Sequence, residues 1–238
     1  MLILGIETSC RTGSLALFRD GHVIDERVLT SESRRHAQGI ATEIDGLLRQ
    51  FDLTARDCDG VAVSIGPGSF TGLRIGVVFA KTFAYATGCA VVAVETLHAV
   101  AELSPSDVTA VSVVSCAQRG DLYTGCYVRS AAGPFVREGA IQIVHASTWC
   151  ANRPGDEIVS GPGVKRYESQ LAGRCRVLEP VYRHPTAAVI AELGSRRLTE
   201  QTADDPWSLE PLYIRRSAAE ENSATEEKSA GQPPVAMD

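Results

Sequence analysis

The chain has 238 residues, of which 44% are hydrophobic and 22% are charged, so its composition is that of a folded protein with one large domain or two small ones. Its formal net charge of −6 argues against nucleic-acid binding by this chain alone, because phosphate recognition depends on Lys and Arg. Seven cysteines without a Cys-x-x-Cys pair, and the lack of any long apolar run, argue against a disulfide framework, a zinc ribbon and a membrane span, so we expect a cytoplasmic protein.

The first half of the chain predicts alternating strands and helices. Apolar runs and alternating patterns predict strands at residues 2–7, 14–18, 22–29, 60–65 and 90–94. Asp20-Gly21 is a hairpin signal between the second and third of these strands. Apolar residues at helical spacing predict helices at residues 40–51, 69–86 and 96–103. The resulting order, β-β-β-α-β-α-β-α, is typical of a ribonuclease-H-like module, in which helices flank a mixed sheet.

The pattern restarts after residue 104. Strands are predicted at residues 108–115, 123–129 and 135–144, which repeats the opening of the first half. We therefore predict an α/β fold of two ribonuclease-H-like modules, at residues 1–104 and 105–216, with the second module reduced. Residues 217–238 are acidic and nearly free of large apolar side chains, so they cannot offset their ordering entropy and are predicted to form a disordered tail.

Residues 66–76 predict a strand end, a tight turn and the start of a helix. Pro67-Gly68 suits the central positions of a type II turn, and Ser69 suits the helix N-cap. No acidic residue occupies the first helical turn, so this helix end would favour an anion. The Walker spacing and the dinucleotide-binding spacing are both absent. We therefore favour glycines that serve the turn and packing over a phosphate loop.

Small residues recur at every fourth position of the same predicted helix, at Gly72, Gly76, Ala80 and Ala84. Glycine inside a helix costs about 0.5–1 kcal/mol relative to alanine, so two of them require a compensating close approach. The ridge would pack either on the protein's own sheet or on a helix of another subunit. The sequence leaves both interpretations open.

Glu7, Thr8 and Ser9 end the first predicted strand, where an actin-like ATPase fold would hold magnesium and phosphate. Together with Gly68 and Ser69 they are the candidates for cofactor binding. The matching strand end in the second half has no carboxylate before Asp121, and phosphoryl transfer then lacks half of its usual metal and base equipment. We therefore expect no catalytic residue and no bound cofactor, and interpret Glu7 as a remnant or as a structural hydrogen-bond acceptor.

The histidines predict no metal site. No two of the five lie three to five residues apart, and His98 with Glu102 supplies only one helical pair, whereas catalytic zinc needs three protein ligands. A Gly-x-Ser-x-Gly nucleophile elbow is also absent from the sequence.

Residues 66–76, in the order Gly-Pro-Gly-Ser-Phe-Thr-Gly-Leu-Arg-Ile-Gly, resemble the signature of the bacterial TsaB (YeaZ) family of tRNA threonylcarbamoyladenosine biosynthesis. Shorter matches follow in family order at residues 3–9, 36–38, 119–123, 161–163, 185–187 and 210–215. The resemblance therefore covers roughly residues 1–216.

Two departures from the family pattern concern the candidate nucleotide site. Ile6-Glu7-Thr8 stands where the family commonly has Ile-Asp-Thr, which is closer to TsaD, the catalytic paralogue. TsaD, however, carries a histidine pair, and this chain has only His98 in the corresponding helix. Cys116-Ala117-Gln118 stands where the family usually has Asp-Ala-Arg, which argues further against nucleotide binding.

The resemblance implies the two-module ASKHA (actin-like ATPase) fold and the role of a non-catalytic partner of TsaD, the threonylcarbamoyltransferase, with the ATPase TsaE joining the pair. The partners would then handle ATP and metal, and contact with tRNA would be indirect. Two enzyme alternatives are a glycoprotein endopeptidase-like hydrolase and a small ASKHA kinase.

Contacts in the family run through helices that correspond to residues 36–51 and 70–85, and the same helices would also allow a homodimer. The expected interface residues are His36, Ile40, Phe70, Gly72, Leu73, Gly76, Val77 and Ala80. On this interpretation, Gly76→Leu abolishes TsaD binding and leaves the monomer folded.

Overall fold

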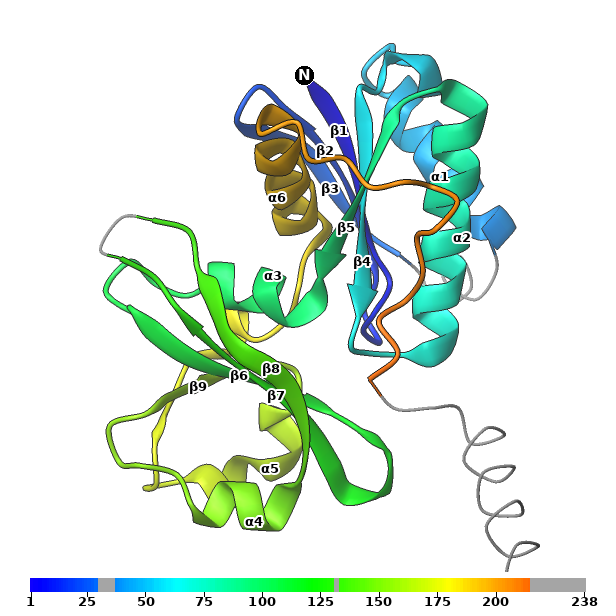
Figure 1. The fold of residues 1–238 in the computed structure, drawn as a ribbon. Coiled ribbons are helices and arrows are strands. Elements are labelled where there is room, and N and C mark those ends of the chain that lie inside the picture. The colour runs from blue at the N-terminus through cyan, green and yellow to red at the C-terminus, as the bar shows by residue number, and fades with distance from the viewer. Residues whose placement is uncertain (30–36, 131–132, 215–238) are drawn as a thin grey trace, which may run out of the picture.

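The computed structural model describes residues 1–29, 37–130 and 133–214, and these form two α/β modules (Figure 1). The first module contains a five-stranded sheet in the order β3-β2-β1-β4-β5. Its strands are β1 (Leu2–Glu7), β2 (Ser14–Arg19), β3 (His22–Val28), β4 (Gly60–Gly66) and β5 (Ala90–Glu95). Strands β1, β2 and β3 pair antiparallel, with a two-residue turn between β2 and β3, whereas β4 and β5 run parallel to β1. The predicted hairpin is confirmed, with positive φ at both Asp20 and Gly21.

The second sheet repeats the topology of the first. Its order is β10-β9-β6-β7-β8, which read backwards matches the first sheet strand for strand. Its strands are β6 (Ala110–Cys116), β7 (Asp121–Val128), β8 (Val136–His145), β9 (Ile158–Ser160) and β10 (Arg176–Val177). The last two strands have only 3 and 2 residues. The predicted pair of ribonuclease-H-like modules, with the second reduced, is therefore confirmed.

Helices cover both faces of the first sheet (Figure 1). The helices are α1 (Ala37–Arg49), α2 (Phe70–Thr87), α3 (Thr96–Glu102), α4 (Ala146–Ala151), α5 (Val164–Leu171) and α6 (Ala187–Thr199). Strand β1 is apolar from Leu2 to Ile6 because both of its faces are buried: Leu4 and Ile6 pack with α1 and α2, and Ile3 packs with α6.

Helix α6 corrects the predicted module boundary. The sequence pattern places residues 105–216 in the second module, but α6 packs on the first sheet, where Ile190 and Ala191 join Ile3 in one buried cluster. A Cβ on Gly5 would lie 2.2 Å from the carbonyl oxygen of Ala187, so only glycine allows the helix this close to β1. The chain thus leaves the first module through α3 and returns to it at α6.

A strap of residues 204–214 follows α6 and runs along α2 (orange in Figure 1). It begins on the outer edge of the first sheet, where the Asp204 amide donates to the carbonyl of Val91 at 2.9 Å and the Asp204 carboxylate pairs with Arg197 at 2.9 Å. Helices α4, α5 and α6 and strands β9 and β10 are elements that the sequence patterns did not predict. His36 and the predicted tail at residues 217–238 lie outside the described residues.

The turn between β4 and α2 differs from the predicted type II turn. The Gly66–Pro67 peptide is cis, and the positive φ of +111° belongs to Gly66 rather than to Gly68. Gly68 is required for a different reason, since a Cβ there would lie 2.5 Å from the carbonyl oxygen of Ser9. Ser69 caps α2 as predicted, its side chain accepting a hydrogen bond from the Gly72 amide.

Helix α2 approaches the end of β1 with no space for side chains between them. A Cβ on Gly72 would lie 2.1 Å from the carbonyl oxygen of Thr8, and one on Gly76 would lie 2.3 Å from the Thr8 hydroxyl oxygen. The small-residue ridge therefore packs on the protein's own sheet, the first of the two interpretations that the sequence left open.

Gly72→Ala is expected to lower the free energy of unfolding by at least about 2 kcal/mol, because the clash is with backbone that cannot rotate away. Gly46→Ala in α1 is the matched control, since its Cβ would meet only the flexible end of Arg27 at 3.4 Å. The control is expected to gain about 0.5–1 kcal/mol from helix propensity. Urea unfolding measures both, and equal midpoints for Gly72→Ala and wild type would contradict the close approach.

Candidate functional site

The five cofactor candidates of the sequence meet at one end of the first sheet. The Ser69 amide donates to the carbonyl of Ser9 at 2.7 Å, and Gly68 lies against Ser9. Glu7 is fully buried, and its Oε1 accepts hydrogen bonds from the amide and the hydroxyl of Ser9 at 2.6 Å and 2.5 Å. Among the described residues, Glu7 Oε2 and Thr8 Oγ1 are buried without a hydrogen-bond partner.

The Glu7 carboxyl is hydrogen-bonded by Ser9 of the loop that follows β1. Burial raises its pKa above the ordinary value of 4.5, and the hydrogen bonds from Ser9 oppose this rise only in part. A raised pKa disfavours magnesium binding, because a carboxyl binds magnesium in its ionised form. The geometry therefore supports Glu7 as a structural hydrogen-bond acceptor.

Three amide donors at the start of α2 are used by the chain itself. The Gly72 amide donates to the Ser69 hydroxyl at 3.3 Å, and the Leu73 amide donates to the Ser69 carbonyl at 2.9 Å. Together with the Ser69 amide, which binds Ser9, these donors are not available to a phosphate group. The glycines of the turn serve packing, as the sequence analysis favoured.

The second module has an equivalent Gly-Pro-Gly turn, which also packs against the end of a neighbouring strand. Gly161-Pro162-Gly163 follows β9, as Gly66-Pro67-Gly68 follows β4. A Cβ on Gly161 would lie 2.2 Å from the carbonyl oxygen of Val114, and the Gly163 amide donates to that carbonyl at 3.0 Å. The repeated Gly-Pro-Gly was visible in the sequence and marks the two equivalent turns. The adjoining strand end holds Cys116, an exposed thiol, in place of a carboxylate.

No cluster of three or more His, Cys, Asp and Glu side chains with metal-binding geometry occurs within residues 1–29, 37–130 and 133–214. His98 and Glu102 instead join α3 to the second sheet. His98 Nε2 lies 2.8 Å from the carbonyl oxygen of Phe135, and Glu102 Oε1 accepts from the Phe135 amide at 2.9 Å. Both side chains therefore act at the junction of the modules.

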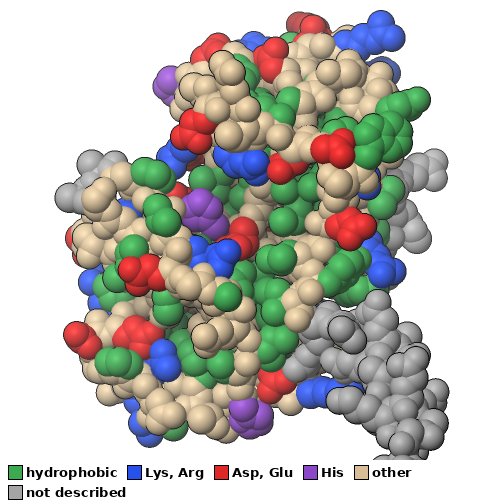
Figure 2. Space-filling model, in the orientation of Figure 1, with side chains coloured by type: hydrophobic (Ala, Val, Ile, Leu, Met, Phe, Trp, Pro, Cys, Tyr) green, Lys and Arg blue, Asp and Glu red, His purple; other side chains and the backbone are tan. Residues whose placement is uncertain are grey.

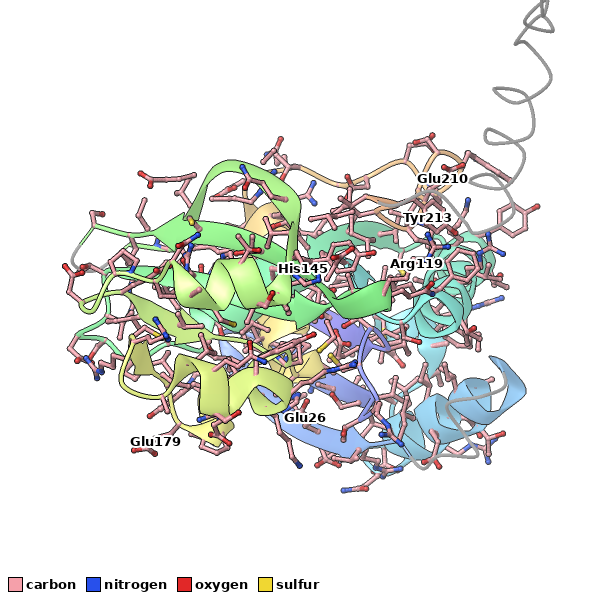
Figure 3. All side chains as sticks on the ribbon, turned by 90° about the horizontal axis from the view of Figure 1, so that it is seen from below. Glu26, Arg119, His145, Glu179, Glu210 and Tyr213 are labelled. Atoms are coloured by element: carbon pink, nitrogen blue, oxygen red, sulfur yellow. The ribbon has the colours of Figure 1, made fainter. Side chains whose placement is uncertain are left out.

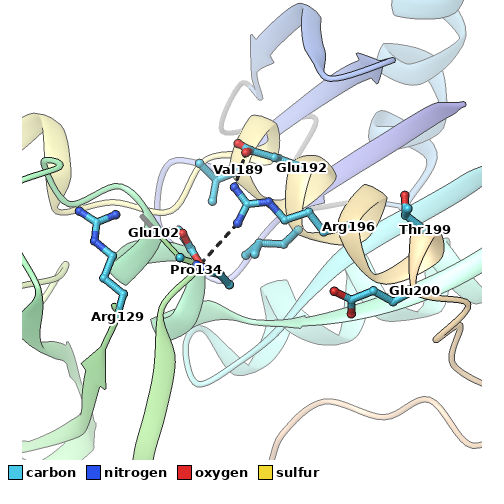
Figure 4. Close-up of a pocket in the computed structure, with 10 residues that line it drawn as sticks. Glu102, Arg129, Pro134, Val189, Glu192, Arg196, Thr199 and Glu200 are labelled. Atoms are coloured by element: carbon cyan, nitrogen blue, oxygen red, sulfur yellow. Dashed lines mark hydrogen bonds and ion pairs between the residues drawn. The ribbon is translucent and has the colours of Figure 1, made fainter. Parts of the chain in front are cut away.

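A cavity of about 550 Å³ lies beside this junction (Figure 4). It is lined by Glu102, Arg129, Gly133, Pro134, Val189, Glu192, Leu193, Arg196, Thr199 and Glu200. Arg196 bridges its carboxylates, at 2.6 Å from Glu192 and 3.7 Å from Glu102. The side chains of Glu102, Glu192 and Arg196 are therefore already paired with one another across the cavity wall.

The outer face of α2 exposes apolar and aromatic side chains, and the strap adds more. The exposed fractions are 58% for Val78, 73% for Tyr85 and 75% for Trp207. Hydrophobic side chains reach the surface on this side of the first module (Figure 2). Figure 3 places Tyr213 of the strap far from Glu26 of β3, on the opposite side of the molecule.

Aromatic and cationic contacts fasten the strap to α2. The rings of Phe70 and Tyr213 lie 5.6 Å apart, and Arg74 lies over the Phe70 ring at 3.9 Å and donates to the Tyr213 hydroxyl at 2.9 Å. Lys81 Nζ donates to the carbonyl of Leu209 at 3.1 Å. Helix α2 and the strap thus form one composite surface, which we call the α2–strap face: Phe70, Arg74, Val78, Tyr85, Trp207 and Tyr213.

Most of the expected interface residues are inside the protein. Leu73, Val77, Ala80 and Ile40 are at most 3% exposed, and Gly72 and Gly76 are buried against Thr8. They are therefore not available to another chain, and Gly76→Leu would disrupt the monomer itself. Of the described residues in that set, Phe70 alone lies at the surface, at 41% exposed.

Sequence reasoning missed the rest of the α2–strap face. Val78 and Tyr85 fall on α2 opposite the small-residue ridge, and that position was a usable signal. Trp207 and Tyr213 follow the last helix, and nothing in their local sequence shows that they lie on α2.

Similarity to known proteins agrees with the fold. Residues 23–132 match the family described as TsaD, tRNA N6-adenosine threonylcarbamoyltransferase. The tRNA threonylcarbamoyladenosine biosynthesis protein TsaB of Bacillus subtilis is 36% identical over 127 residues, which cover 53% of this chain and 55% of that protein. A tRNA N6-adenosine threonylcarbamoyltransferase of Caldicellulosiruptor bescii is 38% identical over 109 residues, which cover 40% of this chain and 32% of that one. The chain thus spans about half and about a third of these two relatives.

Two further relatives match over nearly the full length. An uncharacterized protein of Mycobacterium tuberculosis is 30% identical over 219 residues, which cover 91% of this chain and 93% of that protein. The structure of YeaZ from Pseudomonas aeruginosa superposes with a TM-score of 0.75 at 23% identity, over 90% of this chain and 99% of that one. In the described part of the chain, every helix is too short or too polar to cross a membrane.

Glu7→Gln is expected to become more stable than wild type as the pH rises. The raised pKa means that the folded state holds the Glu7 proton more tightly than the unfolded state does. Wild type therefore loses stability as the pH rises from about 4.5 through the folded-state pKa, whereas the glutamine variant does not. Urea unfolding of both proteins across pH measures the difference, and a difference that moves in favour of wild type with rising pH would refute the assignment.

Proposed function

We propose that the chain is a member of the TsaB (YeaZ) family and acts in tRNA threonylcarbamoyladenosine biosynthesis as a non-catalytic subunit that docks onto TsaD, a proposal that its similarity to the TsaB of Bacillus subtilis supports. TsaE joins the pair in this proposal. ATP and metal are handled by the partners, tRNA is contacted only indirectly, and the complex works in the cytoplasm.

The α2–strap face is the observation that carries the proposal. Val78, Tyr85 and Trp207 are each more than half exposed although they are apolar or aromatic. Exposed aromatic side chains that are held rigidly in place are typical of protein interfaces, because they bury a large area at little cost in side-chain entropy. Arg74 and Lys81 hold this face in one arrangement before any partner binds.

The strand ends support a non-catalytic role. Glu7 is buried, which raises its pKa, and the equivalent position in the second module is occupied by Cys116. Phosphoryl transfer in this kind of fold needs acidic groups that hold metal at both strand ends. A small kinase would therefore have to work without that pair, and a metallohydrolase would need ligands that the described residues do not bring together.

Val78→Glu is expected to weaken TsaD binding at least tenfold, because an interface would then bury an unpaired charge at a cost above about 1.4 kcal/mol. Val23→Glu on β3 is the matched control, since Val23 is 48% exposed on the edge strand that carries Glu26, on the opposite side of the molecule (Figure 3). Co-purification with the TsaD of the same organism measures binding, and unfolding midpoints verify that both variants fold.

A modification assay with TsaD, TsaE, tRNA and a threonylcarbamoyl donor separates docking from catalysis. Omitting this chain or supplying Val78→Glu is expected to lower product formation, and Glu7→Gln is expected to retain it. Loss of product with Glu7→Gln, at unchanged TsaD binding, would mean that the chain takes part in the chemistry. Equal TsaD binding by Val78→Glu and wild type would rule out the α2–strap face as the docking surface.

A further inference from the structure

The C-terminal half of the α2–strap face contains a groove of about 360 Å³. It is lined by Val78, Lys81, Thr82, Tyr85, Pro206 and Trp207. The rings of Tyr85 and Trp207 meet edge to face, with their centroids 5.6 Å apart, and both side chains are about three-quarters exposed. The groove is therefore an aromatic wall above an apolar floor, open to solvent.

The groove is preformed. Lys81 Nζ donates to the carbonyls of Trp207 and Leu209, at 3.3 Å and 3.1 Å, which fixes the strap against α2. The Asp205 carboxylate accepts from the Trp207 amide at 3.1 Å, which holds the turn that presents the indole. A ligand of this groove would not have to order its walls, so little conformational entropy is lost on binding.

Aromatic grooves of this kind suit proline-rich segments. Proline rings stack on Tyr and Trp, and a polyproline II segment is already extended before it binds, so it loses little entropy. The chain itself contains such a segment at residues 232–236, Gln-Pro-Pro-Val-Ala, in which Val235 adds an aliphatic side chain for the apolar floor.

The segment is long enough to reach the groove. Ile214 is the last described residue. Its neighbour Tyr213 contacts the ring of Phe70 at the start of α2. Tyr85 lies about 22 Å further along the helix at 1.5 Å per residue. The roughly 19 residues from Ile214 to Pro233 span up to roughly 60 Å when extended, so the return path leaves ample slack.

We propose that residues 232–236 dock in the groove between Tyr85 and Trp207 of the same chain, with Pro233 and Pro234 against the two rings. The docked segment covers the half of the α2–strap face that holds Val78, Tyr85 and Trp207, so a partner that binds this half has to displace it, and the half around Phe70 and Arg74 stays open. This inference stands on the groove and the chain that follows it, and it does not depend on the proposed function.

The two tryptophans of the chain make the proposal measurable. Trp149 is 6% exposed and Trp207 is 75% exposed in the described structure, so Trp149→Phe leaves one fluorophore, at the groove. In this background, acrylamide quenching is measured for the full chain, for P233S/P234S/V235S and for the control A218S/A219S/A224S. The control changes as many residues elsewhere in the same region.

The quenching constant of Trp207 is expected to rise about twofold in P233S/P234S/V235S, as the indole loses its cover, and to stay unchanged in the control. Equal quenching in all three proteins would overturn the proposal. Protection that appears only as the protein concentration rises would also overturn it, because a second copy would then fill the groove. If Trp149→Phe does not fold, the quenching of Trp149 alone is measured in Trp207→Phe. That signal is then subtracted from the signal of the chain that retains both tryptophans.

Discussion

Helix α2 lies so close to the end of β1 that Gly72 and Gly76 have no space for a Cβ against Thr8, and the accessible surfaces of the first module follow from this approach. The inner face of α2 is buried against the sheet, with Leu73 and Val77 in the core. Whatever α2 does for another molecule must therefore be done by its outer face. The strap extends that face with aromatic side chains that α2 alone would not supply.

The same close packing brings the chain's own backbone into the strand ends of both modules. Gly68 brings the loop against Ser9, and Ser9 in turn supplies two hydrogen bonds to the Glu7 carboxyl. The second module repeats the arrangement with Gly161 and Gly163 against Val114. In both modules, glycines that elsewhere would admit a phosphate group instead admit the chain's own backbone. A fold shared with nucleotide enzymes is thereby compatible with a subunit that docks.

The fold was predictable where pattern and topology coincide, and the site was predictable only in part. The hairpin at Asp20-Gly21 and the buried strand β1 follow from local sequence. The packing of α6 on the first sheet does not follow from local sequence. Ala187 and Ala191 contact Gly5, which is far away in the chain, and nothing near either alanine indicates this contact. The ridge at Gly72 and Gly76 predicted a close approach correctly, but the sequence could not say whether a sheet or a second subunit made it. The position of Trp207 on α2 could not be predicted for the same reason, since only the tertiary structure brings the two together.

Hydrogen–deuterium exchange of this chain, alone and with TsaD, tests the central claim that the outer face of α2 and the strap are the docking surface. The account predicts slower exchange in α2 and in residues 204–214 when TsaD is present, with no change in β3 or in the second sheet. Protection confined to the strand ends around Glu7 and Cys116, with α2 unchanged, would contradict it.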